Sequence, residues 1–327
     1  MKQKKILMIG QGAFATAISN MLTNNGNTVI MLCQENAIAS EINEKKTNIT
    51  YYKETNKLNN IIGITIKELK DYSYDLIFQS IPIPFLEKIL LECKTYINQK
   101  IPWISLSKGI DHQGLTGSKL INKIINPDYV YALSGPSFAT YINKCDYTGV
   151  ILAGANNDWK EYISKIMSNE FFKVYSSDDI YGLELVAAAK NILAIFVGLL
   201  ETLSYHDNAQ ALFFIKSIEQ LSSAIAVLTE KKETVFGLGG IGDLFLTCYG
   251  NASKNKSFGK SLGSYSVLKK DFFVNQEYVC EGIQTTKTFK NLLNQHGLTL
   301  SIFESLYSIL YLQAPIKETI DKLFQSF

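Results

Sequence analysis

Lys190 and Asn191 are the only strongly polar side chains in an otherwise apolar run over residues 185–200. The run predicts a helix that is apolar on every side, which belongs in the interior of a large fold because none of its faces favours water. It is also too short for the roughly 20 apolar residues that a bilayer requires. A buried ammonium needs a partner, since an isolated one costs several kcal/mol or loses its proton. The run alone leaves two interpretations: a lysine whose charged end reaches a nearby surface, or a catalytic lysine in a cleft.

A glycine-dense segment, residues 237–242, offers such a partner at its end in Asp243. A loop so rich in glycine inside a helical region is expensive in conformational entropy, so we expect its backbone to pass close to another group. Further along, Ser253, Lys254 and Asn255 have the residue types of a helix cap and first turn. That turn also has two interpretations: a phosphate site made of exposed backbone N–H groups, or an ordinary capped helix.

The amino-terminal segment has the pattern Gly-x-Gly-x-x-Ala, formed by Gly10, Gly12 and Ala15. A short apolar run over residues 5–9 precedes it, and apolar residues at helical spacing follow over residues 17–22. In such a turn the first glycine makes the tight bend, the second lets the backbone approach a pyrophosphate, and the small third residue permits helix–strand packing. The motif alone is weak, but this order of strand, turn and helix predicts a dinucleotide site.

The second predicted strand, residues 28–33, is followed by Gln34 and Glu35 and has no acid at its tip. An acid there often holds a ribose 2′-hydroxyl, and Glu35 comes slightly late for that role. The chain also has no arginine to bind a 2′-phosphate, so the choice between NAD and NADP stays open. The polar stretch over residues 43–60 predicts a solvated surface loop.

Further short apolar runs alternate with polar or helical segments, which predicts an α/β Rossmann domain with a doubly wound, mostly parallel sheet. Ligands of such sheets bind at the carboxyl ends of the strands. Two of those ends carry candidate ligands, Lys108 and Ser137, although a solvated lysine and a plain turn would also explain them. Helical spacing then dominates, so we expect a Rossmann domain over residues 1–177 and an all-α domain over residues 178–327. The further runs are residues 76–81, 102–106, 130–134, 150–153 and 171–175.

The composition indicates a soluble globular chain, because 46% of its 327 residues are hydrophobic, and its length suggests about two domains. The formal net charge of +2 comes from lysines spread along the chain, without the dense basic block that binds a phosphate backbone. This argues against nucleic acid as a partner. Five cysteines without CxxC spacing fit reduced thiols in a cytosol better than a disulfide framework. The first glycines cut the amino-terminal apolar run too short for a signal peptide, so we expect a cytoplasmic protein.

In this order, the motifs resemble the bacterial type of NAD(P)-dependent glycerol-3-phosphate dehydrogenase over nearly the whole chain. Each motif alone is weak, whereas their combined spacing is specific. The resemblance implies an amino-terminal Rossmann domain and an all-helical carboxyl-terminal domain, with the active site between them. It also implies reversible hydride transfer between NADH or NADPH and the ketone carbon of dihydroxyacetone phosphate, which yields sn-glycerol 3-phosphate for phospholipid synthesis. The motifs span residues 10–15, 106–109, 134–139, 190–191, 239–247, 253–255 and 281–282.

The resemblance makes Lys190 the general acid and base that protonates the carbonyl oxygen as hydride arrives. Lys108 would bind the substrate and polarise its carbonyl, and Asp243 would orient Lys190. For Lys190 to exchange a proton near neutral pH, its pKa should fall from about 10.4 toward roughly 7–8. The implied substrate contacts are Lys108, Gly135, Ser137, Lys190, Asp243, Ser253, Lys254 and Asn255. The implied cofactor contacts are Gly10, Gly12, Ala13, Phe14, Ala15, Gln34, Lys108, Ala139, Lys254, Val279 and Glu281. The resemblance implies no metal and no membrane insertion, and it is compatible with a homodimer.

The chain departs from this family where the family has arginine. The family's Ser-Arg-Asn is Ser253-Lys254-Asn255 here, and its Thr-Arg is Ile215-Lys216. A lysine binds phosphate as a point charge and lacks the bidentate geometry of arginine. We therefore expect weaker substrate binding, but not loss of activity.

Two alternatives remain open. One is a related two-domain dehydrogenase that acts on another small hydroxy acid, against which the phosphate-side Lys254 and Asn255 argue. The other is a catalytically decayed dinucleotide-binding protein, which the exchange of arginine for lysine suggests. Lys108, Lys190 and Asp243 argue against decay, because an idle site has little reason to keep a buried charged cluster.

Overall fold

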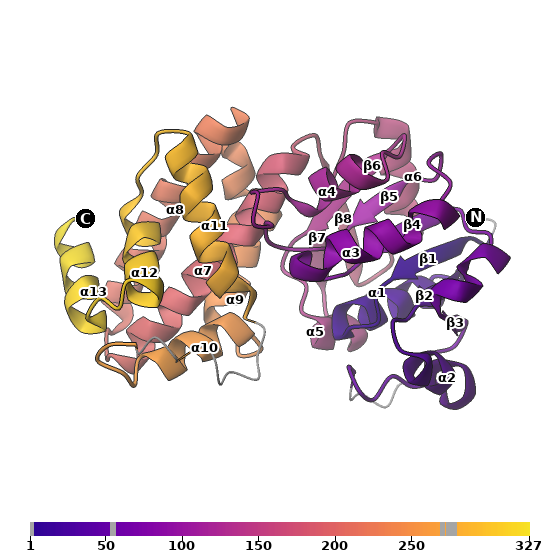
Figure 1. Cartoon of the computed structure of the whole chain (residues 1–327), viewed down its shortest axis with the longest axis horizontal. Coiled ribbons are helices and arrows are strands. Elements are labelled where there is room, and N and C mark those ends of the chain that lie inside the picture. The colour runs from indigo at the N-terminus through magenta and orange to yellow at the C-terminus, as the bar shows by residue number, and fades with distance from the viewer. Residues whose placement is uncertain (1–2, 53–56, 269–271, 273–279) are drawn as a thin grey trace. The chain divides into compact units, whose positions relative to one another are not determined.

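The computed structural model describes residues 3–52, 57–268, 272 and 280–327, and the chain divides into two compact units (Figure 1). The first unit comprises Met1–Lys108 and Gly117–Ile180, and the second comprises Gly109–Thr116 and Tyr181–Phe327. We expected one boundary, between residues 177 and 178, whereas the division by contacts falls after Ile180. A short excursion, Gly109–Thr116, also belongs to the second unit, and its sequence did not indicate this.

One sheet forms the centre of the first unit, with the strand order β3-β2-β1-β4-β5-β6-β7-β8. Its first six positions have the 3-2-1-4-5-6 order of dinucleotide-binding folds. Neighbouring strands pair in parallel except β6 and β7, so the predicted mostly parallel sheet is confirmed. The strands are β1 (Lys5–Ile9), β2 (Thr28–Leu32), β3 (Ile61–Ile64), β4 (Leu76–Gln79), β5 (Trp103–Ser105), β6 (Val130–Ser134), β7 (Thr148–Ala153) and β8 (Phe172–Ser177).

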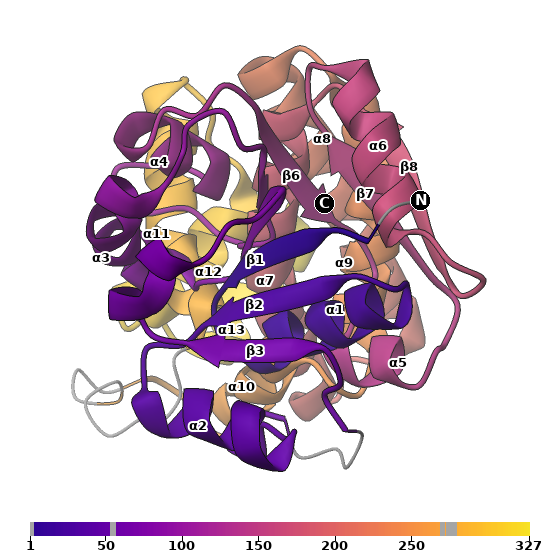
Figure 2. The ribbon, with the colours of Figure 1, turned by 90° about the vertical axis from the view of Figure 1, so that its right-hand side faces the viewer.

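Helices cover both faces of this sheet. Helix α1 contacts β1, β2 and β3 and packs on α5, while α3 and α4 pack on each other. Figure 2 shows α3 and α4 on one side of strand β1 and α1 with α5 on the other. The helical segments of the unit are α1 (Ala13–Asn24), α2 (Asn36–Lys45), η1 (Ile66–Asp71), α3 (Ile83–Cys93), η2 (Lys94–Tyr96), α4 (Gly117–Ile124), α5 (Ala139–Asn143) and α6 (Asn157–Met167).

The stretch over residues 43–60 differs from the predicted solvated loop. Lys45 still belongs to helix α2, and Asn48 is only 2% exposed. The side-chain amide of Asn48 donates to the carbonyl oxygen of Gln11 and to Oγ1 of Thr16, both at 2.8 Å. The prediction is wrong at Asn48 because this polar side chain hydrogen-bonds the glycine turn, a long-range contact that local composition does not reveal.

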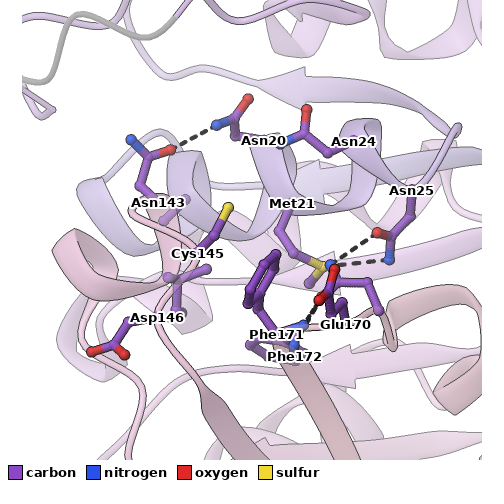
Figure 3. A pocket seen from close by; sticks show the side chains of 13 residues that line it. Asn20, Met21, Asn24, Asn25, Asn143, Cys145, Asp146, Glu170, Phe171 and Phe172 are labelled. Carbon is purple, nitrogen blue, oxygen red and sulfur yellow. Dashed lines mark hydrogen bonds between the residues drawn. The ribbon is translucent and has the colours of Figure 1, made fainter.

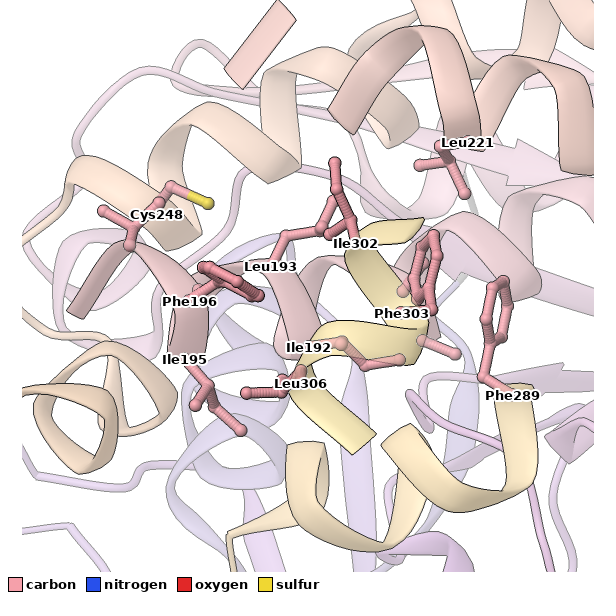
Figure 4. Close-up of a cluster of buried hydrophobic side chains, with 14 of the residues drawn as sticks. Ile192, Leu193, Ile195, Phe196, Leu221, Cys248, Phe289, Ile302, Phe303 and Leu306 are labelled. Carbon is pink, nitrogen blue, oxygen red and sulfur yellow. The ribbon is translucent and has the colours of Figure 1, made fainter. Parts of the chain in front are cut away.

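The second unit is a helical assembly built around α7. All residues from Gly182 to Leu200 in this helix are buried, as the uniformly apolar run predicted. Side chains from α7, α8, α9, α11 and α12 meet in its core (Figure 4). The helical segments are α7 (Ile180–Thr202), α8 (Asp207–Thr229), η3 (Lys232–Phe236), η4 (Leu238–Gly242), α9 (Asp243–Tyr249), α10 (Lys254–Leu262), α11 (Glu281–Gln295), α12 (Ser301–Tyr311) and α13 (Ile316–Gln325).

Helices α7 and α8 are long and apolar enough, by length and composition, to cross a membrane. The argument that the α7 run is too short was therefore wrong, because the helix extends beyond the run to 23 residues. The apolar window of α7 is wholly buried inside the structure, as in the core helix of a globular unit, whereas that of α8 is 33% buried.

Candidate active site

The turn after strand β1 brings open backbone amides to the carboxyl edge of the sheet. Gly10 has a φ of +130°, and a Cβ there would lie 2.9 Å from the carbonyl oxygen of Ser80, so this turn requires glycine. A Cβ at Gly12 would meet no atom within 4 Å, so packing does not explain this second glycine. The amino terminus of α1 has no side-chain cap, which leaves its first N–H groups available to an anion. These features fit the pyrophosphate of a dinucleotide.

The other predicted cofactor contacts of this region lie around the same turn. Ala13 and Phe14 begin α1 and are partly buried, whereas Ala15 is fully buried, as a small residue between helix and strand should be. The backbone N–H of Gln34 donates to Oε1 of Gln11 at 2.8 Å. This bond ties the end of β2 to the glycine turn.

Lys108 follows strand β5 and is the last residue of the first segment of its unit, where it is partly buried. The turn before it is fixed to the neighbouring strand end: Nε2 of Gln79 donates to Oγ of Ser107 at 2.6 Å, and that hydroxyl donates to the carbonyl oxygen of Ile81. Lys108 therefore lies at a carboxyl strand end, where ligands of such sheets bind.

Gly135 and Ser137 form the turn between β6 and α5. Gly135 has a φ of +153°, and a Cβ there would lie 2.9 Å from the carbonyl oxygen of Gly149, so the turn needs glycine. The Ser137 hydroxyl is buried and donates to the Gly135 carbonyl oxygen at 2.9 Å. Ala139 begins α5, which packs on α1. The motif forms a turn, as both interpretations require, and contact with substrate stays a prediction.

The predicted ion pair between Lys190 and Asp243 is present inside the second unit. Lys190 is 4% exposed and Asp243 is 1% exposed, and Nζ of Lys190 donates to Oδ1 of Asp243. Oγ1 of Thr247 lies 3.4 Å from the same carboxylate oxygen. Burial raises the pKa of the nearby Cys248 thiol to about 12, against the opposing charge of Lys190, so this thiol stays neutral. The burial of Lys190 rules out a lysine whose charged end reaches the surface.

The glycine-dense segment before Asp243 is helical, so its prediction as a loop was wrong. Residues Leu238–Gly242 form the π-helical turn η4, which leads directly into α9 with Asp243 as its first residue. The expected close approach is confirmed, because a Cβ at Gly240 would lie 1.9 Å from the carbonyl oxygen of Val235. The tight packing of this turn fixes the start of α9 and with it the position of Asp243.

Helix α7 also holds the amino termini of α10 and α11 close together. Nδ2 of Asn191 donates to Oε2 of Glu281, the first residue of α11, at 3.3 Å. The backbone N–H of Gly282 donates to Oδ1 of Asn255, in the first turn of α10, at 3.1 Å. A Cβ at Gly282 would lie 2.8 Å from both the Asn191 carbonyl oxygen and Asn255 Oδ1. Two positive helix ends therefore meet beside the polar pair of α7, and the carboxylate of Glu281 already lies at the end of α11.

The segment before and within the first turn of α10 is the predicted cap. Oγ of Ser253 accepts a hydrogen bond from the backbone N–H of Lys256 at 3.3 Å, so this hydroxyl caps the helix. Lys254 occupies the first helical position and is exposed. The predicted cofactor contact Val279 lies outside the residues that the structure describes.

Sequence reasoning missed an ion-pair network at the carboxyl end of α7. The carboxylate of Glu201 lies 2.6 Å from Nζ of Lys256 and 2.7 Å from Nζ of Lys260. The i, i+4 spacing of the two lysines, which places them on one face of α10, was the available signal.

A cavity of about 280 Å³ lies elsewhere in the first unit, along the carboxyl-terminal half of α1 (Figure 3). The side-chain amides in it serve the protein: Nδ2 of Asn20 donates to Oδ1 of Asn143 at 2.6 Å, and Nδ2 of Asn25 donates to the carbonyl oxygens of Ile166 and Met167. None of the predicted site residues lines this cavity. Within the described part of the chain, no group of three or more His, Cys, Asp or Glu side chains could hold a metal ion.

Comparison with known proteins agrees with this geometry. The chain matches the family models described as NAD-dependent glycerol-3-phosphate dehydrogenase N-terminus, over residues 5–160, and C-terminus, over residues 179–321. It is 31% identical over 326 residues to a Staphylococcus haemolyticus protein named glycerol-3-phosphate dehydrogenase (NAD(P)+), and the match covers 98% of this chain and 97% of that protein. A Clostridium botulinum protein of the same name is 31% identical over 320 residues, covering 98% and 96%.

The same likeness holds in three dimensions. The crystal structure of glycerol-3-phosphate dehydrogenase from Coxiella burnetii matches with a TM-score of 0.91 at 25% identity, covering 99% of each chain. The strand order of the first unit, the helical second unit and both family matches point the same way. The chain belongs to the NAD-dependent glycerol-3-phosphate dehydrogenase family.

Proposed function

We propose that this chain reduces dihydroxyacetone phosphate to sn-glycerol 3-phosphate with NADH or NADPH, and that Lys190 is its general acid and base. The observation that carries the proposal is the enclosed ion pair of Lys190 and Asp243 in a chain of this family. The carboxylate of Asp243 stabilises an ammonium that burial alone would disfavour, so Lys190 can carry a proton inside an enclosed site.

In this mechanism the reduced nicotinamide supplies the hydride to the ketone carbon. Negative charge then develops on the carbonyl oxygen, and Nζ of Lys190 donates the proton that neutralises it. Asp243 is a positioning residue that aims Nζ and stabilises the ammonium, and a proton taken up from water restores that ammonium between turnovers. In the oxidation direction Lys190 removes the hydroxyl proton. Lys108 polarises the same carbonyl as a second positive charge.

The dinucleotide is held by the first unit through the amino terminus of α1. The backbone of Gly12, Ala13 and Phe14 takes the pyrophosphate, and Gly10 and Ala15 permit the turn and its packing. The support is the uncapped helix end and the open space at Gly12. The remaining cofactor contacts that we propose are Gln34, Lys108, Ala139, Lys254, Val279 and Glu281.

The substrate phosphate is held at the amino terminus of α10. Lys254 supplies charge and Asn255 supplies hydrogen bonding there, while Ser253 keeps the turn in place. Gly135 and Ser137 complete the substrate contacts. Because lysine offers one charged donor group in place of the fork of arginine, phosphate binding is weaker than an arginine at position 254 would allow.

The assembly that fits the chain is a homodimer through α8. Leu212, Ile215 and Val227 are 43%, 53% and 50% exposed. At about 100° per residue they lie within a stripe of roughly 120° on one side of the helix. A second copy that covers this stripe would bury the exposed apolar residues of α8, so the helix need not insert into a membrane. Sedimentation at micromolar concentration would then show twice the mass of the chain. We also infer that the substrate is small and phosphorylated and that the protein works in the cytoplasm, and we expect no nucleic-acid partner.

The test is the loss of NADH absorbance, and separately of NADPH absorbance, when dihydroxyacetone phosphate is added to the pure protein. Oxidation only with the phosphate ester is the expected result, with unphosphorylated dihydroxyacetone as the control. Equal oxidation with both ketones would contradict the phosphate site and favour a dehydrogenase of another small substrate. If a folded protein oxidises neither NADH nor NADPH with either ketone, the catalytically decayed alternative would be favoured.

A further inference from the structure

Glu35 comes after the end of strand β2, yet its carboxylate turns back to the glycine turn. Its Oε1 accepts hydrogen bonds from Nε2 of Gln11 and from the hydroxyl of Tyr51, both at 3.1 Å. Nε2 of Gln11 lies 3.2 Å from the same hydroxyl, which closes a triangle of three polar side chains. Glu35 follows the strand tip by a few residues, but the fold brings its carboxylate back to the glycine turn, where it can contact a ribose.

Hydrogen bonds to Gln11 hold these three side chains in place. Gln11 is 9% exposed, and its Oε1 accepts the backbone N–H of Gln34 at 2.8 Å. The buried amide of Asn48 holds the carbonyl oxygen of Gln11 at 2.8 Å. The carboxylate of Glu35 is therefore fixed before any ligand arrives, which lowers the entropy cost of binding.

In dinucleotide-binding folds the adenosine ribose lies beside the end of the second strand and the glycine turn, where this carboxylate also lies. An acid about 20 residues after the glycine fingerprint accepts the ribose 2′-hydroxyl of NAD, and NADP sites supply a positive group for the 2′-phosphate. Among the described residues, hydrogen bonds engage only Oε1 of Glu35, so Oε2 can accept from ribose. The chain has no arginine to offset a 2′-phosphate of up to about two negative charges.

We propose that Glu35, held by Gln11 and Tyr51, makes this chain prefer NAD(H) over NADP(H). The carboxylate accepts a ribose hydroxyl of NAD and repels the 2′-phosphate of NADP. This inference rests on the proposed use of a dinucleotide and names which of the two is bound.

The test measures dissociation constants for NADH and NADPH by nucleotide fluorescence, without substrate, in the wild type and in Glu35→Gln. The wild type should bind NADH at least about tenfold more tightly than NADPH. Glu35→Gln should reduce that ratio about tenfold, mainly through tighter binding of NADPH, because it removes the charge and keeps the shape. The matched control is Glu44→Gln, which removes an exposed charge from α2, the helix that Glu35 precedes, and should leave the ratio unchanged.

The dependence of the NADH/NADPH preference on ionic strength distinguishes repulsion by the Glu35 charge from an effect of its shape. Raising the ionic strength from about 0.05 M to about 0.5 M should narrow the wild-type preference, because charge repulsion between exposed groups is screened. A wild-type ratio near one, an unchanged ratio in Glu35→Gln or a ratio insensitive to salt would each overturn the proposal. Preference for NADPH together with turnover of dihydroxyacetone phosphate would overturn only the role of Glu35. A folded protein that binds neither nucleotide would overturn the proposed function as well.

Discussion

Helix α7 carries two lysine–carboxylate arrangements that differ in their surroundings. At its middle, Lys190 pairs with Asp243, and both side chains are almost fully buried. At its carboxyl end, Glu201 pairs with Lys256 and Lys260, and the side chain of Lys260 is 52% exposed. The chemical groups are the same, but the second arrangement is partly open to water: Lys256 is buried, whereas the side chains of Glu201 and Lys260 are partly exposed.

The difference in burial separates a chemical role from a structural one. A buried ion pair gives little net stability, because removing both charges from water costs about as much as their attraction returns. The Glu201 network instead fixes α10 against α7, where a Cβ at Gly198 would lie 2.1 Å from the carbonyl oxygen of Lys256. We therefore assign proton transfer to the buried pair and helix docking to the exposed network.

After the loss expected on replacing Lys190 itself, the next largest effect is expected when its partner loses its charge and keeps its shape. Asp243→Asn should lower kcat about ten- to a hundredfold, because an amide neither aims nor stabilises the ammonium of Lys190 as a carboxylate does. The dissociation constant for NADH should stay near that of the wild type, because Asp243 is not among the proposed cofactor contacts. Steady-state kinetics with thermal unfolding as a folding check would test this. An unchanged kcat would remove Asp243 from the mechanism.

A smaller effect is expected at the first turn of α10. Lys254→Arg should lower KM for dihydroxyacetone phosphate about threefold to tenfold, because a guanidinium binds phosphate with two hydrogen bonds. The kcat should change less, since Lys254 does not move a proton. Initial rates over a range of substrate concentrations give both constants. If KM stays the same, Lys254 does not touch the phosphate.

The smallest effect is expected at the exposed network and depends on pH. Burial alone would raise the pKa of Glu201, but hydrogen bonds and charge from Lys256 and Lys260 outweigh it and hold the pKa below its usual value of 4.5. A lowered pKa stabilises the fold above about pH 4.5, and this contribution is lost as the pH falls through the folded-state value.

Glu201→Gln should therefore be less stable than the wild type at neutral pH, with a gap that closes below about pH 4.5. Urea unfolding at a series of pH values measures the gap. A gap that stays constant down to acid pH would show that the charge of Glu201 does not contribute.

Local patterns predicted the parts of the molecule that depend on near neighbours in the chain. The glycine turn at Gly10 and Gly12, the buried helix α7 and the cap at Ser253 follow from residue types and spacing. The partner of Lys190 was also predictable, because the buried ammonium required one and Asp243 was the acid next to the glycine-dense segment.

Features that depend on distant contacts were not predictable from the sequence. Strand β3 is four residues long and was missed, and the antiparallel pairing of β6 with β7 depends on how the chain crosses the sheet. The position of the Glu35 carboxylate depends on Gln11 and Tyr51, which lie 24 and 16 residues away in the chain. The helical form of residues 238–242 depends on packing against Val235, which the glycine content alone did not show.

The central claim is that Lys190 of α7 does the chemistry, whereas the lysines of α10 that pair with Glu201 do not. The most direct test compares kcat for the reduction of dihydroxyacetone phosphate in Lys190→Met and in Lys256→Met, with saturating substrate and NADH. We predict that Lys190→Met loses about a thousandfold in kcat while still binding NADH, and that Lys256→Met stays within about threefold of the wild type. Similar values of kcat in the two folded variants would contradict the account.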